Sequence, residues 1–126
     1  DYLFGPHQVS DGTLRAIAII TLFLQPEADL PDVIILDEPE LGQHPHGLEI
    51  IAGLIRAASV KSQVIVATQS RTFLEHFEPP EIVVVDTTEG SSRFQRLDAE
   101  QLKDWLVEYS IGELWEKNVL GGGPLR

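Results

Sequence analysis

The chain has 126 residues, enough for one domain with a single hydrophobic core. Its formal net charge of −11 disfavours direct binding of nucleic acid, because phosphates would be repelled on average. The absence of cysteine excludes disulfides, and no apolar run reaches the roughly 18 residues that a membrane-spanning helix needs. No basic, apolar leader opens the chain, so we expect a cytoplasmic protein with no membrane partner.

The first half of the chain predicts alternating helices and strands. Residues 1–9 show no clear period and indicate a loop, and a polar cap before an apolar run predicts a helix at 14–24. The β-branched run at 33–36 predicts a strand that is buried on both faces. A second helix is predicted to begin at Pro45 and end near residue 58, and a second strand is predicted at 64–67.

The second half predicts shorter elements. In chain order these are a helix at 71–77, a strand at 82–85, an antiparallel strand at 93–97 and helices at 99–108 and 112–117, before a flexible tail at 121–124. Strands that alternate with helices are typical of a parallel sheet covered by helices. We therefore expect an α/β fold with a mostly parallel sheet, a small antiparallel edge and a helical C-terminus. So small a sheet has exposed edges, which indicates that the chain is part of something larger.

A carboxylate pair ends the first predicted strand, in the segment VIILDEPE at 33–40. Ligands of open parallel sheets bind at the carboxyl ends of the strands, where Asp37 and Glu38 are expected to lie. Mg²⁺ commonly takes one or two carboxylates together with phosphate oxygens and water. We expect Asp37 to hold Mg²⁺ and Glu38 to act on an attacking water. By itself the segment also fits a second interpretation, in which Asp-Glu-Pro only ends a strand and caps a helix.

Five segments, in order along the chain, together resemble the C-terminal half of an ABC-type ATPase. The resemblance is to the RecF/SMC-like branch, which is AAA ATPase-like and belongs to the P-loop NTPase superfamily, rather than to membrane transporters. VSDGTLR at 9–15 resembles the signature motif, and VIILDE at 33–38 resembles a Walker B strand with its catalytic glutamate. ELGQHP at 40–45 resembles the D-loop, and IVATQS at 65–70 stands in the place of the switch-histidine loop. YSIGELW at 109–115 resembles the C-terminus of that branch.

The resemblance implies that ATP and Mg²⁺ are the ligands, and it assigns residues to them. Ser10 and Gly12 would bind the γ-phosphate of a nucleotide held by a partner subunit, at a helix start whose N–H groups favour an anion. Asp37 would bind Mg²⁺ beside the ATP, Glu38 would be catalytic, and His44 would be a D-loop contact at the nucleotide interface. The shared sites imply a head-to-tail homodimer. Taken alone, the segment at 10–12 is also an ordinary helix cap.

Gln69 departs from the family pattern, which has histidine at this position. Glutamine donates and accepts hydrogen bonds and can orient a water, but it does not titrate. We expect Gln69 to be a catalytic, water-orienting residue that supports slower turnover than histidine would. The two arginines nearest to these motifs, Arg15 and Arg71, are interpreted as solvated or structural rather than as phosphate or carboxylate partners.

A P-loop, G-x-x-x-x-G-K-[ST], does not occur in these 126 residues. In ABC-type ATPases it lies upstream of the signature motif, so the chain is interpreted as the C-terminal lobe of a longer, ATP-hydrolysing protein. Residues 1–97 would belong to the ATPase core and residues 98–126 to a helical extension. The missing Walker A half would then be the main partner, nucleic acid would bind only through other regions, and the chain alone is expected to be inactive.

Two other classes of protein stay open at this point. One is a non-catalytic dimerisation or interaction module, although an intact carboxylate pair argues against a decayed site. The other is a Mg²⁺-dependent nuclease or phosphatase that uses Asp37, Glu38 and Glu40. That alternative needs further acidic ligands at other strand ends, where Asp86 is the only candidate.

Overall fold

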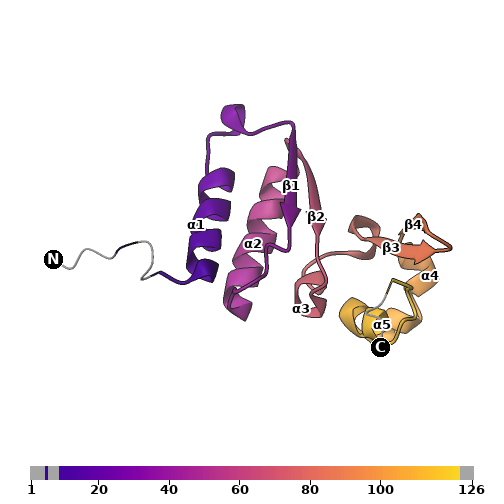
Figure 1. The fold of residues 1–126 in the computed structure, drawn as a ribbon. Coiled ribbons are helices and arrows are strands. Elements are labelled where there is room, and N and C mark those ends of the chain that lie inside the picture. Colours follow the sequence, from indigo (N-terminus) through magenta and orange to yellow (C-terminus); the bar gives the residue numbers. More distant parts are fainter. Residues whose placement is uncertain (1–4, 6–8, 123–126) are drawn as a thin grey trace. The chain divides into compact units, whose positions relative to one another are not determined.

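The computed structural model describes residue 5 and residues 9–122. The chain divides into two compact units, residues 1–68 and residues 69–126, which are described separately below (Figure 1). Most of the loop predicted at 1–9 lies outside the described residues. Within the described part of the chain, no helix has both the length and the apolar character needed to cross a membrane.

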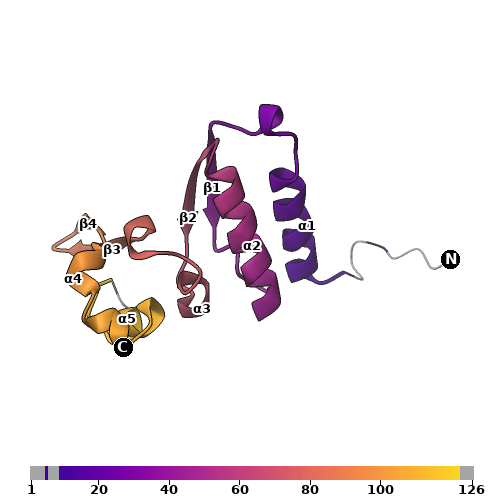
Figure 2. The ribbon, with the colours of Figure 1, turned by 180° about the vertical axis from the view of Figure 1, so that it is seen from behind.

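The first unit is a two-stranded parallel sheet with two helices on one side of it. Its elements are α1 (Asp11–Phe23), a 3₁₀ turn η2 (Glu27–Asp29), β1 (Val33–Asp37), α2 (Pro45–Ala58) and β2 (Gln63–Ala67). The strands pair in parallel from Val33 opposite Gln63 to Asp37 opposite Ala67. Figures 1 and 2 show α1 and α2 side by side on the same side of this sheet. The two predicted helices and two predicted strands of this half are confirmed within a few residues.

Local signals in the sequence explain where these helices begin. The Ser10 hydroxyl accepts a hydrogen bond from the Thr13 N–H at 3.2 Å and so caps α1. Pro45 occupies the first turn of α2, where its missing N–H and fixed φ cost nothing. The buried residues of α2 recur at helical spacing, which places one apolar face against the sheet and α1: Leu48, Ile51, Ala52, Ile55 and Ala58.

The sheet of the first unit has one covered face and one open face. Ile34 of β1 is buried on the covered face, together with Ile19 and Phe23 of α1. On the other face Val33 is 48% exposed and Ile35 is 72% exposed. The prediction that this strand is buried on both faces is therefore wrong for the described residues, because both helices pack on the same side.

The second unit is built from short elements. They are α3 (Arg71–Leu74), η3 (Pro79–Glu81), β3 (Val83–Thr88), β4 (Ser91–Arg96), α4 (Ala99–Leu102), η4 (Trp105–Val107) and α5 (Ile111–Glu116). β3 and β4 form an antiparallel hairpin, as predicted for the edge strand. A turn with positive φ at Glu89 (52°) and Gly90 (79°) connects them.

Two predictions for this half need correction. The strand predicted at 82–85 as a third parallel strand pairs only with β4 among the described residues, because the tight turn at Glu89 returns the chain beside it. The single helix predicted at 99–108 is two short pieces, α4 and η4. Asp104 stands between them, and aspartate favours caps and turns over helix interiors.

The second unit has its own small core. Its buried members come from β3, the chain after β4, α5 and the C-terminal segment: Val84, Leu97, Ile111, Leu114 and Leu120. Arg71 of α3 forms ion pairs with carboxylates on its own helix and on α5, including Glu116 at 2.9 Å. Gly112 permits this packing, because a Cβ there would lie 2.4 Å from the Arg71 Cγ. Arg71 is thus a carboxylate partner within the second unit, the alternative that the sequence interpretation disfavoured, and its role there is structural.

Candidate nucleotide site of the first unit

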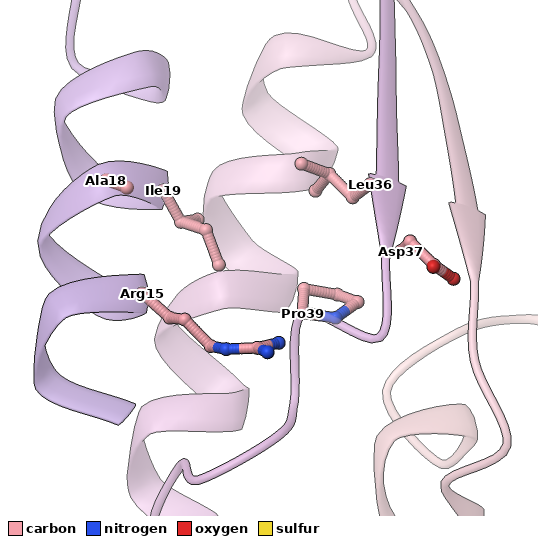
Figure 3. Close-up of a pocket in the computed structure, with 6 residues that line it drawn as sticks. All are labelled: Arg15, Ala18, Ile19, Leu36, Asp37 and Pro39. Atoms are coloured by element: carbon pink, nitrogen blue, oxygen red, sulfur yellow. The ribbon is translucent and has the colours of Figure 1, made fainter. Parts of the chain in front are cut away.

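The carboxylate pair lies at the carboxyl end of β1. Residues alternate between the two faces of a strand, so Asp37 shares the open face with Val33 and Ile35. Its side chain is exposed, and Figure 3 shows the carboxylate pointing away from α1. Glu38 follows it, half-buried, with a φ of 44°. An exposed carboxylate oxygen at a parallel strand end suits a hard cation such as Mg²⁺.

The turn after Glu38 is bonded to the end of β2. The Glu38 N–H donates to the Ala67 carbonyl at 2.8 Å, and the Leu41 N–H donates to the Glu38 carbonyl at 3.2 Å. The Thr68 hydroxyl donates to Glu40 Oε1. The bonds to Ala67 of β2 and to Thr68, which follows it, fix where this turn, and with it Glu38, lies relative to the neighbouring strand end.

The same loop also reaches the start of α1. Gln43 Nε2 donates to the Gly12 carbonyl at 2.8 Å, a contact between residues 31 apart in the sequence. Gly12 is buried, and a Cβ on it would lie 2.2 Å from the Gly42 carbonyl oxygen. Gly12 therefore serves a close backbone contact with the loop at 40–45, a role that no local sequence pattern predicts.

The signature segment forms a capped helix start. Ser10 is exposed, and its hydroxyl lies 2.8 Å from the Thr13 hydroxyl as well as capping α1. Asp11 is exposed in the first turn. α1 has 13 residues, so its N-terminus carries the unpaired N–H groups and the positive dipole end expected of a full helix.

His44 and Gln69 occupy helix-start positions. His44 is exposed and caps α2, with its Nδ1 accepting from the His46 N–H at 3.3 Å. Gln69 is exposed and directly precedes Ser70, whose hydroxyl caps α3. The structure thus brings Gly12, the carboxylate pair and the loop at 40–45 together in the first unit, while Gln69 opens the second unit.

A small hollow lies beside the carboxylate pair. Its volume is about 170 Å³, and its lining comes from α1, β1 and the turn after β1: Arg15, Ala18, Ile19, Leu36, Asp37 and Pro39 (Figure 3). Ligand pockets commonly measure about 300–1,000 Å³, so this hollow is too small for a nucleotide. Arg15 extends toward Pro39 and makes no ion pair with the residues that the structure describes, in keeping with a solvated arginine.

The acidic side chains near the strand end form a pair and not a larger cluster. Among residues 5 and 9–122, no three histidine or acidic side chains converge in a way that could hold a metal ion. A Mg²⁺ ion at Asp37 would therefore complete its shell with phosphate oxygens and water. Asp86, the further acidic candidate of the nuclease alternative, lies in the second unit.

The fold is similar to that of a solved ATPase structure. A solved structure described as "Structural biochemistry of ATP-driven dimerization and DNA stimulated activation of SMC ATPases" superposes with a TM-score of 0.61 and 22% sequence identity. The match covers 81% of this chain and 62% of that chain, so the chain spans less than two thirds of its relative. The fold is thus the mixed α/β fold of an SMC ATPase, as the sequence predicted.

A family model matches more than half of the chain. Residues 1–75 match the model of the family described as "AAA domain, putative AbiEii toxin, Type IV TA system". Because the match spans more than half of the chain, the chain belongs to this family of P-loop NTPases. It is an ATPase-related domain with an SMC-like fold. A search of the curated proteins found no match.

Proposed function

We propose that the chain is the C-terminal lobe of an ATP-binding, ATP-hydrolysing, non-transporter ABC-type ATPase. One observation carries the proposal: the loop that follows Asp37 and Glu38 is bonded both to the first turn of the signature helix and to the end of β2. Segments that the resemblance assigns to the two shared nucleotide sites of a dimer therefore meet within the first unit. A strand that merely ended in Asp-Glu-Pro would not require these long-range contacts.

Each residue then has a role at a shared ATP site. Mg²⁺, when bound at Asp37, would neutralise charge on the phosphates. Glu38 accepts the proton of an attacking water or positions that water, and Gln69 orients it. Ser10 and the N–H groups at the start of α1 bind the γ-phosphate of the nucleotide on a partner subunit, and His44 contacts the same interface. This arrangement needs a head-to-tail homodimer.

The open face of the sheet supports the proposal that a further segment packs on it. Val33, Ile35 and Ile65 are 48%, 72% and 47% exposed, and all three lie on the face that bears Asp37. A parallel sheet is normally covered on both faces. The Walker A half, on a segment upstream of residue 1, would cover this face and bring the P-loop lysine to the phosphates.

The experiment is Mg·ATP binding and turnover, first with this chain alone and then with the upstream segment restored. The expected result is no turnover alone and turnover on restoration. Glu38→Gln should then reduce kcat by about 10²–10⁴-fold, which is the usual contribution of a general base, with binding retained. Tight binding by the isolated chain would contradict the proposal. Binding with dimerisation but no turnover by the restored protein would favour a non-catalytic dimerisation module.

Gln69 provides a second test of the same site. Replacement by histidine should raise kcat of the restored protein, since histidine can contact the γ-phosphate and also carry charge. The measurement is steady-state turnover at saturating Mg·ATP, with Gln69→Glu as the control that keeps size and removes the donor. An unchanged or lower rate in Gln69→His would count against a water-orienting role for Gln69.

A further inference from the structure

Glu38 has a backbone conformation that side-chain-bearing residues rarely adopt. Its φ of 44° lies in the left-handed region, which costs an L-residue about 1–2 kcal/mol. Such a residue persists only where its surroundings determine the conformation. Contacts of the turn must therefore hold Glu38, and with it the direction of its carboxylate.

Two hydrogen bonds tie the Glu38 turn to β2. One joins the Glu38 N–H to the Ala67 carbonyl at 2.8 Å, and the other joins the Thr68 hydroxyl to Glu40 Oε1. Pro39, between the two bonded residues, is buried. The turn is thus fixed on both sides of a rigid proline, once through the backbone and once through a side chain.

The Glu40 carboxylate is held inward. Its Oε2 atom is buried and receives no hydrogen bond from the residues that the structure describes. Burying a carboxylate oxygen without a donor is unfavourable, so the contact through Oε1 must offset that cost. Hydrogen bonds to a charged acceptor are stronger than neutral ones, which makes the pair with the Thr68 hydroxyl an effective tie.

We propose that Glu40 is a positioning residue, which holds Glu38 in its left-handed conformation by accepting a hydrogen bond from Thr68. The catalytic consequence rests on the function proposed above, in which Glu38 acts on water. Without the tie, Pro39 and Glu40 move away from β2 and Glu38 relaxes toward an ordinary φ. Its carboxylate then points in another direction while Asp37 stays at the end of β1.

The experiment uses the intact protein that contains this chain. Thr68→Val keeps the shape and removes the hydroxyl, Thr68→Ser keeps the hydroxyl, and Glu40→Ala removes the acceptor. Loss of one charged hydrogen bond should lower kcat about tenfold or more in Thr68→Val and Glu40→Ala, with KM within about twofold. Thr68→Ser should retain the rate, and the double variant should be no slower than Glu40→Ala alone. Thr21→Val, at an exposed site on α1, is the matched control.

A second readout does not depend on activity. Amide hydrogen exchange of Glu38 should accelerate in Thr68→Val and Glu40→Ala, while exchange of Ile35 within β1 stays as in the wild type. Unchanged exchange at Glu38 overturns the proposal, as does an equal acceleration at both amides, which would mean general loosening. If the wild type binds ATP without hydrolysing it, the proposed function fails. The exchange data still decide whether Glu40 holds Glu38.

Discussion

The two units of the chain differ in how fully their apolar side chains are buried. The second unit closes its own core around Leu114, which is fully buried, and supports it with the Arg71 ion pairs to α5. The first unit covers only one face of its sheet and leaves Ile35 largely exposed on the other. The unit that carries the carboxylate pair is thus the unfinished one. Under the proposed function, this open face is where the Walker A half would pack.

The largest expected effect tests the independence of the second unit. Leu114→Ala removes a fully buried side chain and should lower the free energy of unfolding by about 2–5 kcal/mol. Amide exchange should accelerate in the second unit and stay unchanged in α2. Val107→Ala is the control, because Val107 is 82% exposed and its truncation should stay within about 0.5 kcal/mol. Equal acceleration of amide exchange in both units would contradict the independence of the second unit.

The next effect lies in the first unit. Gly12→Ala places a Cβ 2.2 Å from the Gly42 carbonyl oxygen, so the D-loop has to move. Overpacking of this kind should cost about 1–3 kcal/mol of the free energy of unfolding. Gly53→Ala is the matched control: Gly53 lies in α2 with nothing within 4 Å of the added Cβ, and the change should stabilise the protein by about 0.5–1 kcal/mol. Urea unfolding of the two variants measures both changes in the free energy of unfolding. A Gly12→Ala variant as stable as the wild type would contradict the close contact.

A smaller loss of stability is expected when the hydrogen bond between Gln43 and Gly12 is removed. Gln43→Leu keeps the bulk of the side chain and removes the hydrogen bond to the Gly12 carbonyl, which should cost about 1 kcal/mol. Gln25→Leu removes a similar but exposed bond to the Leu22 carbonyl and should stay within about 0.5 kcal/mol. Urea unfolding measures both. Equal losses in the two variants would show that the loop gains nothing from its link to α1.

The smallest effect is a pH dependence confined to the second unit. The Ser110 backbone N–H, bonded to Glu113 at 2.9 Å, lowers the pKa of this carboxyl below its ordinary 4.5, with Arg71 adding to the shift. The stabilisation is therefore complete above pH 4.5 and is lost as the pH falls through the lowered value. Exchange of α5 amides should accelerate on acidification. Glu113→Gln should flatten that response, and Glu100→Gln on α4 should leave it as in the wild type.

Elements with strong local signals could be predicted from the sequence. Ser10 marks the start of α1 and Pro45 that of α2, and the helical spacing of apolar residues gives the buried face of α2. Asp37 and Glu38 were recognised because they follow an apolar run directly. Each of these signals acts over a few residues, and the local sequence therefore contains it.

Contacts between distant residues could not be predicted in this way. β3 was assigned to a parallel sheet because the order of elements says nothing of which strand pairs with it. The contacts of Glu40 with Thr68 and of Gln43 with Gly12 join residues 28 and 31 apart, with no periodic pattern to mark them. The ordered resemblance to ATPase motifs relates these segments to the shared nucleotide sites of a dimer, but it does not say which side chains hold the loop.

The contact of Gly12 with Gly42 bears on how inactive relatives would be recognised. A Cβ on either glycine would press against the backbone of the other, whether or not a nucleotide ever binds. Under the proposed function, a relative that has lost ATP hydrolysis would therefore keep a glycine at the position of Gly12 for folding alone. A φ of 44° at Glu38 costs glycine less than glutamate, so under the proposed function Glu38 would be free to change first. Loss of that glutamate, and not retention of the glycine, is the better marker of a decayed ATPase.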